Sequence, residues 1–167
     1  MARLSRYLGQ VLVLALVGIA VAVFSDTPAY THLAADQAMV KLSLVHNAAR
    51  VGACRRRTAE ELAKLAPNMR KPLDCPRGRL PMVVEFEIDG VAVFSASAPP
   101  TGIAGDGPSR VYQRFVLPVG LHRLAVRMRD TARESGFDYE AEQVFNLRPR
   151  QNLVIDFKAE PGGLVFR

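Results

Sequence analysis

The longest apolar stretch of the chain lies near its start. Residues 8–24 carry no charge, and from Val11 to Phe24 every residue is apolar or Gly. A helix of about 17 residues rises roughly 25 Å at 1.5 Å per residue, slightly less than the ~30 Å hydrocarbon core of a bilayer. Flanking Tyr7, Gln10 and Ser25 suit the membrane interface. The pattern therefore predicts a transmembrane helix over residues 8–24.

The distribution of charge on either side of this stretch predicts its orientation. Arg3 and Arg6 precede it, whereas no Lys or Arg follows it until Lys41. Positively charged residues flanking a membrane helix favour the cytoplasmic side. We therefore expect residues 1–7 to be cytoplasmic, and the chain from Ser25 onward to lie outside the cytoplasm, in the periplasm or an equivalent compartment.

A cleaved signal peptide is the main alternative for the same segment. It has a short basic start, an apolar centre and, at Ala20-Val21-Ala22, a run of small residues suited to cleavage. The mature protein would then be secreted. A buried helix of a soluble protein is a third interpretation. The first two alternatives agree that the rest of the chain is exported.

Beyond a linker over residues 25–37, apolar and polar residues alternate with the period of two that is typical of strands. The clearest example is Met82 to Ile88, and Asp89-Gly90 after it suits a two-residue type I′ hairpin turn. The pattern predicts strands at residues 39–46, 82–88, 91–96, 111–117, 122–128, 139–147 and 153–157, with a final edge strand at 164–166.

Seven or eight short strands with turns every ~8–12 residues are typical of an antiparallel β-sandwich or open barrel. The chain's 12 Gly and 11 Pro agree with a fold rich in turns. A parallel α/β sheet would require helical crossovers, which the connections are too short to form. We therefore expect residues 38–167 to form an exported, mainly β domain of the antiparallel sandwich type.

Residues 47–80 differ from the rest of this domain and predict an irregular insertion. Thr58 and Glu61 have the spacing of a capping box, which predicts one short helix, and Leu62 and Leu65 would face inward. Pro67 ends this helix, and Pro72, Pro76 and Pro81 keep the chain after it irregular. We expect no strand in the insertion.

The only two cysteines, Cys54 and Cys75, lie in this insertion. Two cysteines in one irregular segment usually pair in an oxidising compartment. Closing a loop of this size contributes on the order of 3 kcal/mol through the unfolded state. A structural disulfide between them is therefore our first expectation.

A metal or redox site is the alternative use of these residues. His46, Cys54, Met69 and Cys75 are soft ligands of the kind that copper prefers. Their spacing fits no compact metal motif, and the sequence has neither the CxxC of thiol exchange nor the CxxCH of haem attachment. Apart from copper in this alternative, we expect no cofactor.

The insertion also concentrates positive charge. Residues 47–80 hold nine Lys and Arg against three Asp and Glu, which equals the net charge of +6 of the whole chain. On an anchored, exported protein this surface is suited to anionic lipid head groups or to an acidic protein face, whereas nucleic acid is excluded by the expected compartment. A solvated surface is the remaining interpretation. The candidate contact residues are Arg50, Arg55, Arg56, Arg57, Arg70, Lys71, Arg77 and Arg79.

Other polar residues are better explained by structure than by chemistry. His122 lies on a predicted strand next to a turn, where a hydrogen-bonded structural role is expected. Asp130, Glu134 and Asp138 lack the spacing of a calcium loop, and the arginines among them would act as ion-pair partners. We find no catalytic motif anywhere in the sequence.

The stretch Leu117-Pro-Val-Gly-Leu-His-Arg-Leu-Ala-Val126, with the turn Ile88-Asp89-Gly90, resembles a strand of PEGA-like and transthyretin-like β-sandwich modules. The resemblance implies a mostly non-catalytic module, although a fold alone does not fix function.

We therefore expect an anchored binding or accessory module that contacts another envelope protein or a membrane complex. The basic insertion and the loops at residues 99–108 and 130–138 are the expected contact surfaces. A copper or thiol-redox accessory protein and an enzyme with an unrecognised site are the alternatives.

Overall fold

The computed structural model describes residues 2–27, 31–160 and 162–167. It divides the chain into two compact units, Met1–Ala34 and Ala35–Arg167. Met1 of the predicted cytoplasmic segment and residues 28–30 of the predicted linker lie outside the described residues.

The first unit contains the helix α1 (Ala2–Asp26), which is longer than the predicted residues 8–24. Its 25 residues rise about 37 Å, which exceeds the ~30 Å core of a bilayer. The helix begins before the apolar stretch because the polar residues that precede this stretch contain no helix breaker. Pro28 follows the last turn and disfavours its continuation.

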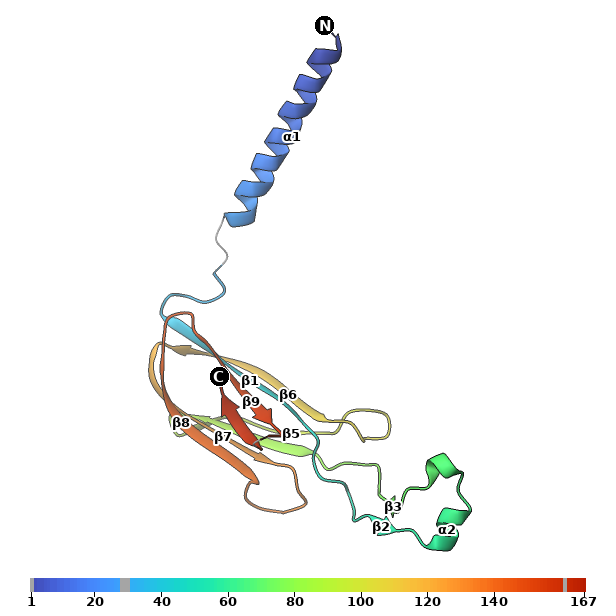
Figure 1. The fold of residues 1–167 in the computed structure, drawn as a ribbon. Helices are drawn as coiled ribbons and strands as arrows, with labels where there is room; N and C mark the ends of the chain where they lie inside the picture. Colours follow the sequence, from blue (N-terminus) through green and yellow to red (C-terminus); the bar gives the residue numbers. More distant parts are fainter. Residues whose placement is uncertain (1, 28–30, 161) are drawn as a thin grey trace. The chain divides into compact units, whose positions relative to one another are not determined.

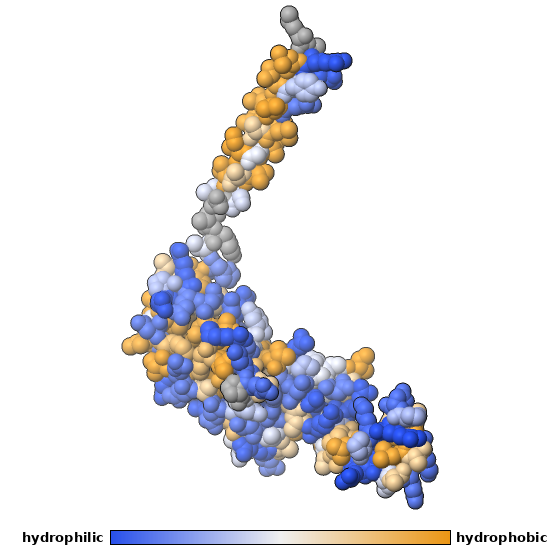
Figure 2. Space-filling view, in the orientation of Figure 1, coloured by the Kyte–Doolittle hydropathy of each residue, from blue (hydrophilic) through white to orange (hydrophobic). Residues whose placement is uncertain are grey.

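Helix α1 is long and apolar enough to span a membrane, and a signal sequence shares these properties. Figure 2 shows hydrophobic residues over most of its length. The predicted N-terminal apolar helix is therefore confirmed, while its orientation and its retention in the mature protein stay predictions.

The second unit contains two four-stranded sheets (Figure 1). One sheet has the strand order β10-β9-β1-β6, and the other has the order β5-β4-β7-β8. The predicted antiparallel sandwich class is confirmed. The strands are β1 (Gln37–His46), β4 (Met82–Ile88), β5 (Val91–Ala98), β6 (Ser109–Pro118), β7 (Gly120–Arg129), β8 (Tyr139–Leu147), β9 (Asn152–Lys158) and β10 (Gly163–Phe166).

The hydrophobic core lies between these sheets and follows from the alternation in the sequence. Alternate residues of β1, such as Val40 and Leu42, are fully buried, and so are alternate residues of β4 and β7, such as Phe86 and Val126. The ring centroids of Phe86 and Phe115 lie 5.0 Å apart across the core. Burial of these apolar faces is the main favourable contribution to the fold.

The hairpin between β4 and β5 confirms a turn that local sequence predicts. Asp89 and Gly90 have φ angles of 53° and 83°, both in the left-handed region that a type I′ turn requires. Gly adopts this region without a steric penalty, and Asp is among the few other residues that tolerate it.

One strand pair departs from the predicted antiparallel arrangement. Strands β1 and β9 pair in parallel, with Val40 opposite Leu153. The chain crosses from β8 in one sheet to β9 in the other, so β9 enters beside β1 without a hairpin. Alternation within a strand predicts which face is buried but contains no information about the neighbouring strand.

Residues 47–80, which we call the arm, leave the sandwich between β1 and β4 (Figure 1). The arm contains β2 (Arg55–Arg56), α2 (Ala59–Ala63), the 3-10 turn η1 (Pro67–Met69) and β3 (Leu73–Asp74). The pairing of β2 with β3 corrects the expectation that the arm has no strand. Such two-residue strands are too short to show alternation.

The predicted capping box of the arm is present. The Glu61 amide donates to Thr58 Oγ1 at 3.3 Å, and the Thr58 amide donates to Glu61 Oε2 at 2.9 Å. However, none of the five described residues of α2 is buried. Leu62 and Leu65, expected to face inward, are only partly covered, so the helix adds little to the core.

Candidate functional site

The arm is closed by the predicted disulfide between Cys54 and Cys75, which are 21 positions apart. The bridge lies next to the β2–β3 ribbon, in which Arg55 is opposite Asp74 and Arg56 is opposite Leu73. Because side chains alternate across a strand, these two pairs project from opposite faces of the ribbon. The two faces differ in their contacts.

One face of the ribbon holds a network of ion pairs. Asp74 Oδ1 accepts from Arg57 at 3.0 Å, and Asp74 Oδ2 lies 3.4 Å from Arg55. Arg55 also donates to Glu61 at 2.9 Å. The amide of Thr58 and the Arg55 guanidinium hold the pKa of Glu61 below its usual range. Two of the predicted partner-contacting arginines, Arg55 and Arg57, therefore brace the arm itself.

The base of the arm is fixed to the loop over residues 99–108. Arg77 donates to Asp106 Oδ2 at 2.7 Å, which lowers the pKa of Asp106. Arg79 donates to the Asp106 carbonyl oxygen at 3.0 Å and to the Ala48 carbonyl oxygen at 2.8 Å. Arg77 and Arg79 are thus engaged within the chain, and this loop, expected as a separate contact surface, supports the arm.

The other five cations of the arm form two groups, one bound to backbone carbonyl oxygens and one without a partner. Arg50 and Arg70 donate to the carbonyl oxygens of Pro76 and Leu65. Within the described part of the chain, the side chains of Arg56, Lys64 and Lys71 have no hydrogen-bond or ion-pair partner. Three cations are therefore available for an external anion.

Exposed apolar residues lie among these cations. Leu73, opposite Arg56 in the ribbon, is 54% exposed, and Met69, two positions before Lys71, is 59% exposed. Figure 2 shows hydrophobic and hydrophilic residues intermixed at the end of the arm. Arg and Met are enriched at the cores of protein interfaces. Arg56, Met69, Lys71 and Leu73 together, which we call the arm surface, have the composition of a contact site.

His46, the first of the four candidate copper ligands, is engaged elsewhere. Its Nε2 atom lies 2.6 Å from Asp130 Oδ2, and its ring centroid lies 4.3 Å from that of Phe157. The sulfur atoms of Cys54 and Cys75 are joined to each other, and Met69 is exposed on the arm. Among the residues the structure describes, no three His, Cys, Asp or Glu side chains form a possible metal site. The structure thus does not bring the predicted set together.

In the loop between β7 and β8, the carboxylate of Asp138 is bound by other groups of the same loop. Burial opposes ionisation of Asp138, but the amides of Asp130 and Thr131 and the Thr131 hydroxyl hold the pKa of Asp138 below its usual range. Arg133 lies 3.4 Å from Asp138. Burial raises the pKa of the neighbouring Tyr139. Ion pairing of an arginine within this loop agrees with the prediction.

His122 has the structural role expected from its position. Its Nδ1 atom lies 2.8 Å from Asp89 Oδ2, and its Nε2 atom lies 3.1 Å from the Pro118 carbonyl oxygen. The contact with His122 and the Arg123 amide lower the pKa of Asp89. His122 therefore fastens the β4–β5 turn to the start of β7.

The outer face of the β5-β4-β7-β8 sheet carries an ion-pair cluster that sequence reasoning missed. Arg127 lies 2.9 Å from Glu85, 2.5 Å from Glu87 and 3.6 Å from Glu140. Register places these residues on three adjacent strands, so a pattern within one strand cannot reveal them. Arg127 is therefore paired within the sheet, in contrast to Arg56 and Lys71 of the arm surface.

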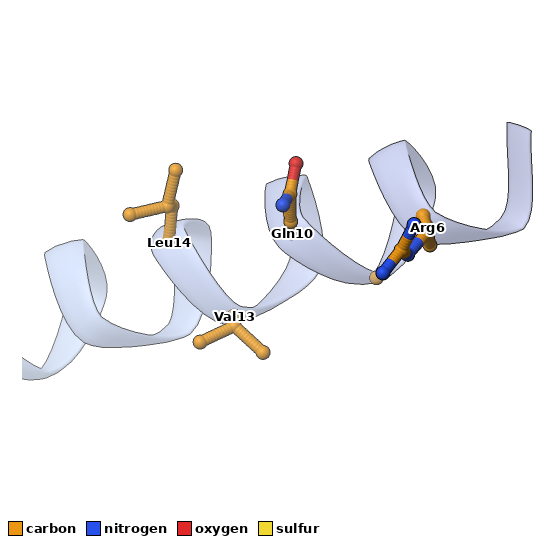
Figure 3. Close-up of a pocket in the computed structure, with 5 residues that line it drawn as sticks. Arg6, Gln10, Val13 and Leu14 are labelled. Atoms are coloured by element: carbon orange, nitrogen blue, oxygen red, sulfur yellow. The ribbon is translucent and has the colours of Figure 1, made fainter. Parts of the chain in front are cut away.

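Among the residues that the structure describes, two of the surface hollows have volumes comparable with ligand sites. One, of ≈ 360 Å³, is lined by His46, Phe157 and four smaller or exposed residues at the end of β1. The other lies along α1 beside Arg6, Gln10, Val13 and Leu14 (Figure 3). Because its walls are side chains of a single apolar helix, it is not an enclosed site.

No protein-family model matches this chain, and no curated protein matches it. The resemblance of residues 117–126 to PEGA-like and transthyretin-like modules therefore stays a prediction.

Proposed function

We propose that this protein is a non-catalytic binding module, tethered to a membrane by α1 outside the cytoplasm, that contacts an acidic face of another envelope protein through its arm. The observation that carries the proposal is that some cations of the arm are paired within the chain, whereas others are not. Arg55 and Arg57 form ion pairs within the arm, and Arg77 and Arg79 fix its base. In contrast, Arg56 and Lys71 have no partner among the described residues and lie beside exposed Met69 and Leu73.

This arrangement favours binding because the arm loses most of its conformational entropy when the chain folds, before a partner binds. A disulfide, a capping box and ion pairs already restrict the arm, so association loses less conformational entropy. The unpaired cations supply electrostatic complementarity, and the neighbouring apolar side chains supply area to be desolvated.

The disulfide and α1 support the proposed compartment. Structural disulfides persist in oxidising environments outside the cytoplasm. An apolar N-terminal helix, preceded by Arg3 and Arg6, is the feature that would carry the following domain across a membrane and hold it there.

The test is purification of the full chain from detergent-solubilised membranes, with Arg56→Glu and Lys71→Glu introduced together. Because neither side chain has a partner in the described structure, the arm should stay folded while its charge is reversed. We expect recovery of the specific partner to fall at least about ten-fold, which corresponds to ~1.4 kcal/mol.

Arg110→Glu with Arg114→Glu is the matched control. Both residues are exposed on β6, outside the arm, and have no ion-pair partner in the described residues. The control should recover the partner as the unchanged protein does. Equal loss in both variants would indicate a general charge effect, and equal retention in both would refute a role for the arm.

A further inference from the structure

We propose that the end of the sandwich at which β1 begins rests on an anionic membrane surface. The inference rests on the proposed anchoring by α1 and adds a second, lipid-facing site to it. The site consists of the β6–β7 turn (residues 118–121) and the β8–β9 turn (residues 148–151), together with residues 36–37. We call these residues the proximal end.

Backbone hydrogen bonds gather the three segments of the proximal end. The Val119 amide donates to the Asp36 carbonyl oxygen at 3.0 Å, and the Arg150 amide donates to the Gln37 carbonyl oxygen at 2.7 Å. Gly120 is paired with Leu147, which joins the two turns directly. The chain therefore enters the sandwich between an apolar turn and a basic turn.

The side chains of the proximal end have the composition of an interfacial membrane surface. Leu121 is 73% exposed and Val119 is 37% exposed, although both are apolar. The side chains of Arg148 and Arg150 are exposed, and neither has an ion-pair partner in the described part of the chain. Asp36 is the only acid in these segments. Apolar side chains that enter the head-group region beside cations are the usual basis of peripheral membrane binding.

The short linker favours a membrane as the surface that the proximal end contacts. Helix α1 ends at Asp26 and β1 begins at Gln37. Ten intervening residues reach at most about 36 Å when fully extended. The proximal end is thus tethered close to the surface that α1 would cross, and a lipid surface is present at high effective concentration.

The opposite end of β1 carries the arm. His46, the last residue of the ten-residue strand, precedes the arm and lies opposite Ser109, where the loop over residues 99–108 returns. The strand is about 30 Å long. Docking through the proximal end therefore holds the arm surface away from the lipid, where a protein partner can reach it.

The chain has no Trp, so a single introduced Trp reports on one position. The experiment places Leu121→Trp in the full chain, reconstituted in phosphatidylcholine vesicles with or without phosphatidylglycerol. Its emission should shift to shorter wavelength, and aqueous quenching should fall, when phosphatidylglycerol is present. Ile103→Trp, on the exposed loop at the other end of the sandwich, is the matched control and should not respond.

Charge removal tests the basic turn. One cation near an anionic surface changes the docking equilibrium about five-fold, so Arg148→Gln with Arg150→Gln should lower the docked-to-undocked ratio about 30-fold. Arg110→Gln with Arg114→Gln removes the same charge from the face of β6 and should leave the response of the Leu121→Trp reporter unchanged. The fold of each variant is checked by circular dichroism.

The possible outcomes are distinct. Failure of the chain to float with vesicles refutes the anchoring by α1 and is measured separately from the fluorescence response. If the chain floats with the vesicles but the two Trp reporters respond equally, the proximal-end proposal is overturned. A response that depends on protein concentration instead of lipid also overturns it and would indicate contact between two copies. An equal shift in neutral and anionic vesicles overturns the role of the two arginines.

Discussion

The Nε2 atom of His46 lies 2.6 Å from Oδ2 of Asp130, and this contact joins the end of β1 to the end of β7 across 84 positions of sequence. Only 16% of the His46 side chain and 11% of the Asp130 side chain are exposed. The Asp130 carbonyl oxygen also accepts from the Ala49 amide at the start of the arm. The pair therefore connects the two sheets where the arm leaves them.

Removing either member of this pair should destabilise the sandwich. Asp130→Ala or His46→Ala leaves a mostly buried polar group without its partner, which costs about 1–3 kcal/mol. The double variant should lose less than the sum of the single variants because the two side chains share one interaction. Urea denaturation of the four proteins measures this coupling. Strict additivity would show that the contact contributes nothing to stability.

Acid stability should depend on Asp89. Because His122 lowers the pKa of Asp89 in the folded chain, its carboxylate stabilises the fold above its ordinary pKa of 3.8. That contribution is lost as the pH falls through the lower folded value. Asp89→Asn should therefore show a smaller loss of stability than the natural chain when the pH is lowered from about 5 to about 2.

Asn is the appropriate replacement at this position because Asp89 has a φ of 53°, and Asn tolerates the left-handed region. The comparison therefore changes the charge and keeps the turn. Urea unfolding at several pH values provides the measurement, and parallel stability curves for the two proteins would contradict the assignment.

Local sequence patterns were sufficient for the parts of the fold that are local. Strand β4 has the predicted bounds, since Met82, Val84, Phe86 and Ile88 alternate with half-exposed residues and Asp89-Gly90 ends the run. The capping box at Thr58 was predictable for the same reason, because both of its hydrogen bonds lie within four residues.

Contacts between distant segments could not be predicted in this way. Asp130 looked like a member of an acidic loop and His46 like a metal ligand, because nothing near either residue identifies the other as its partner. The same holds for Arg77 and Asp106, which are 29 positions apart. The sequence showed a uniform basic segment, whereas pairing in three dimensions separates its structural cations from its free ones.

The cluster around Arg127 should contribute to stability in a salt-dependent manner. Arg127→Gln leaves Glu85, Glu87 and Glu140 close together without a cation, and we expect a loss of about 1 kcal/mol at low salt. Screening should reduce this loss at high salt. Arg123→Gln is the control, since Arg123 is half exposed and its one ion pair among the described residues is with Glu142 at 3.4 Å. It should have a smaller effect, and a larger one would contradict the ranking.

Loss of the disulfide should open the arm while the sandwich stays folded. Among the described residues, the hydrophobic core cluster includes none from the arm. Without the Cys54–Cys75 bridge, the arm is held mainly by exposed ion pairs, each worth about 0–1 kcal/mol, whereas ordering each residue costs about 1–2 kcal/mol. The variant Cys54→Ser with Cys75→Ser should therefore be cleaved by protease first within residues 55–74.

The free energy of global unfolding of this variant should fall by less than the ~3 kcal/mol expected for a bridge of this loop length. The reason is that the arm of the variant, which lacks the bridge, is already open while its sandwich is still folded. Hydrogen exchange locates the change: amides of the arm should lose protection, while those of β4 and β7 keep theirs. The unchanged protein treated with a reductant should behave like the double variant. If protection is lost in the arm and in β4 together, the arm and the sandwich form one cooperative unit, and a separately braced contact element is the wrong description of residues 47–80.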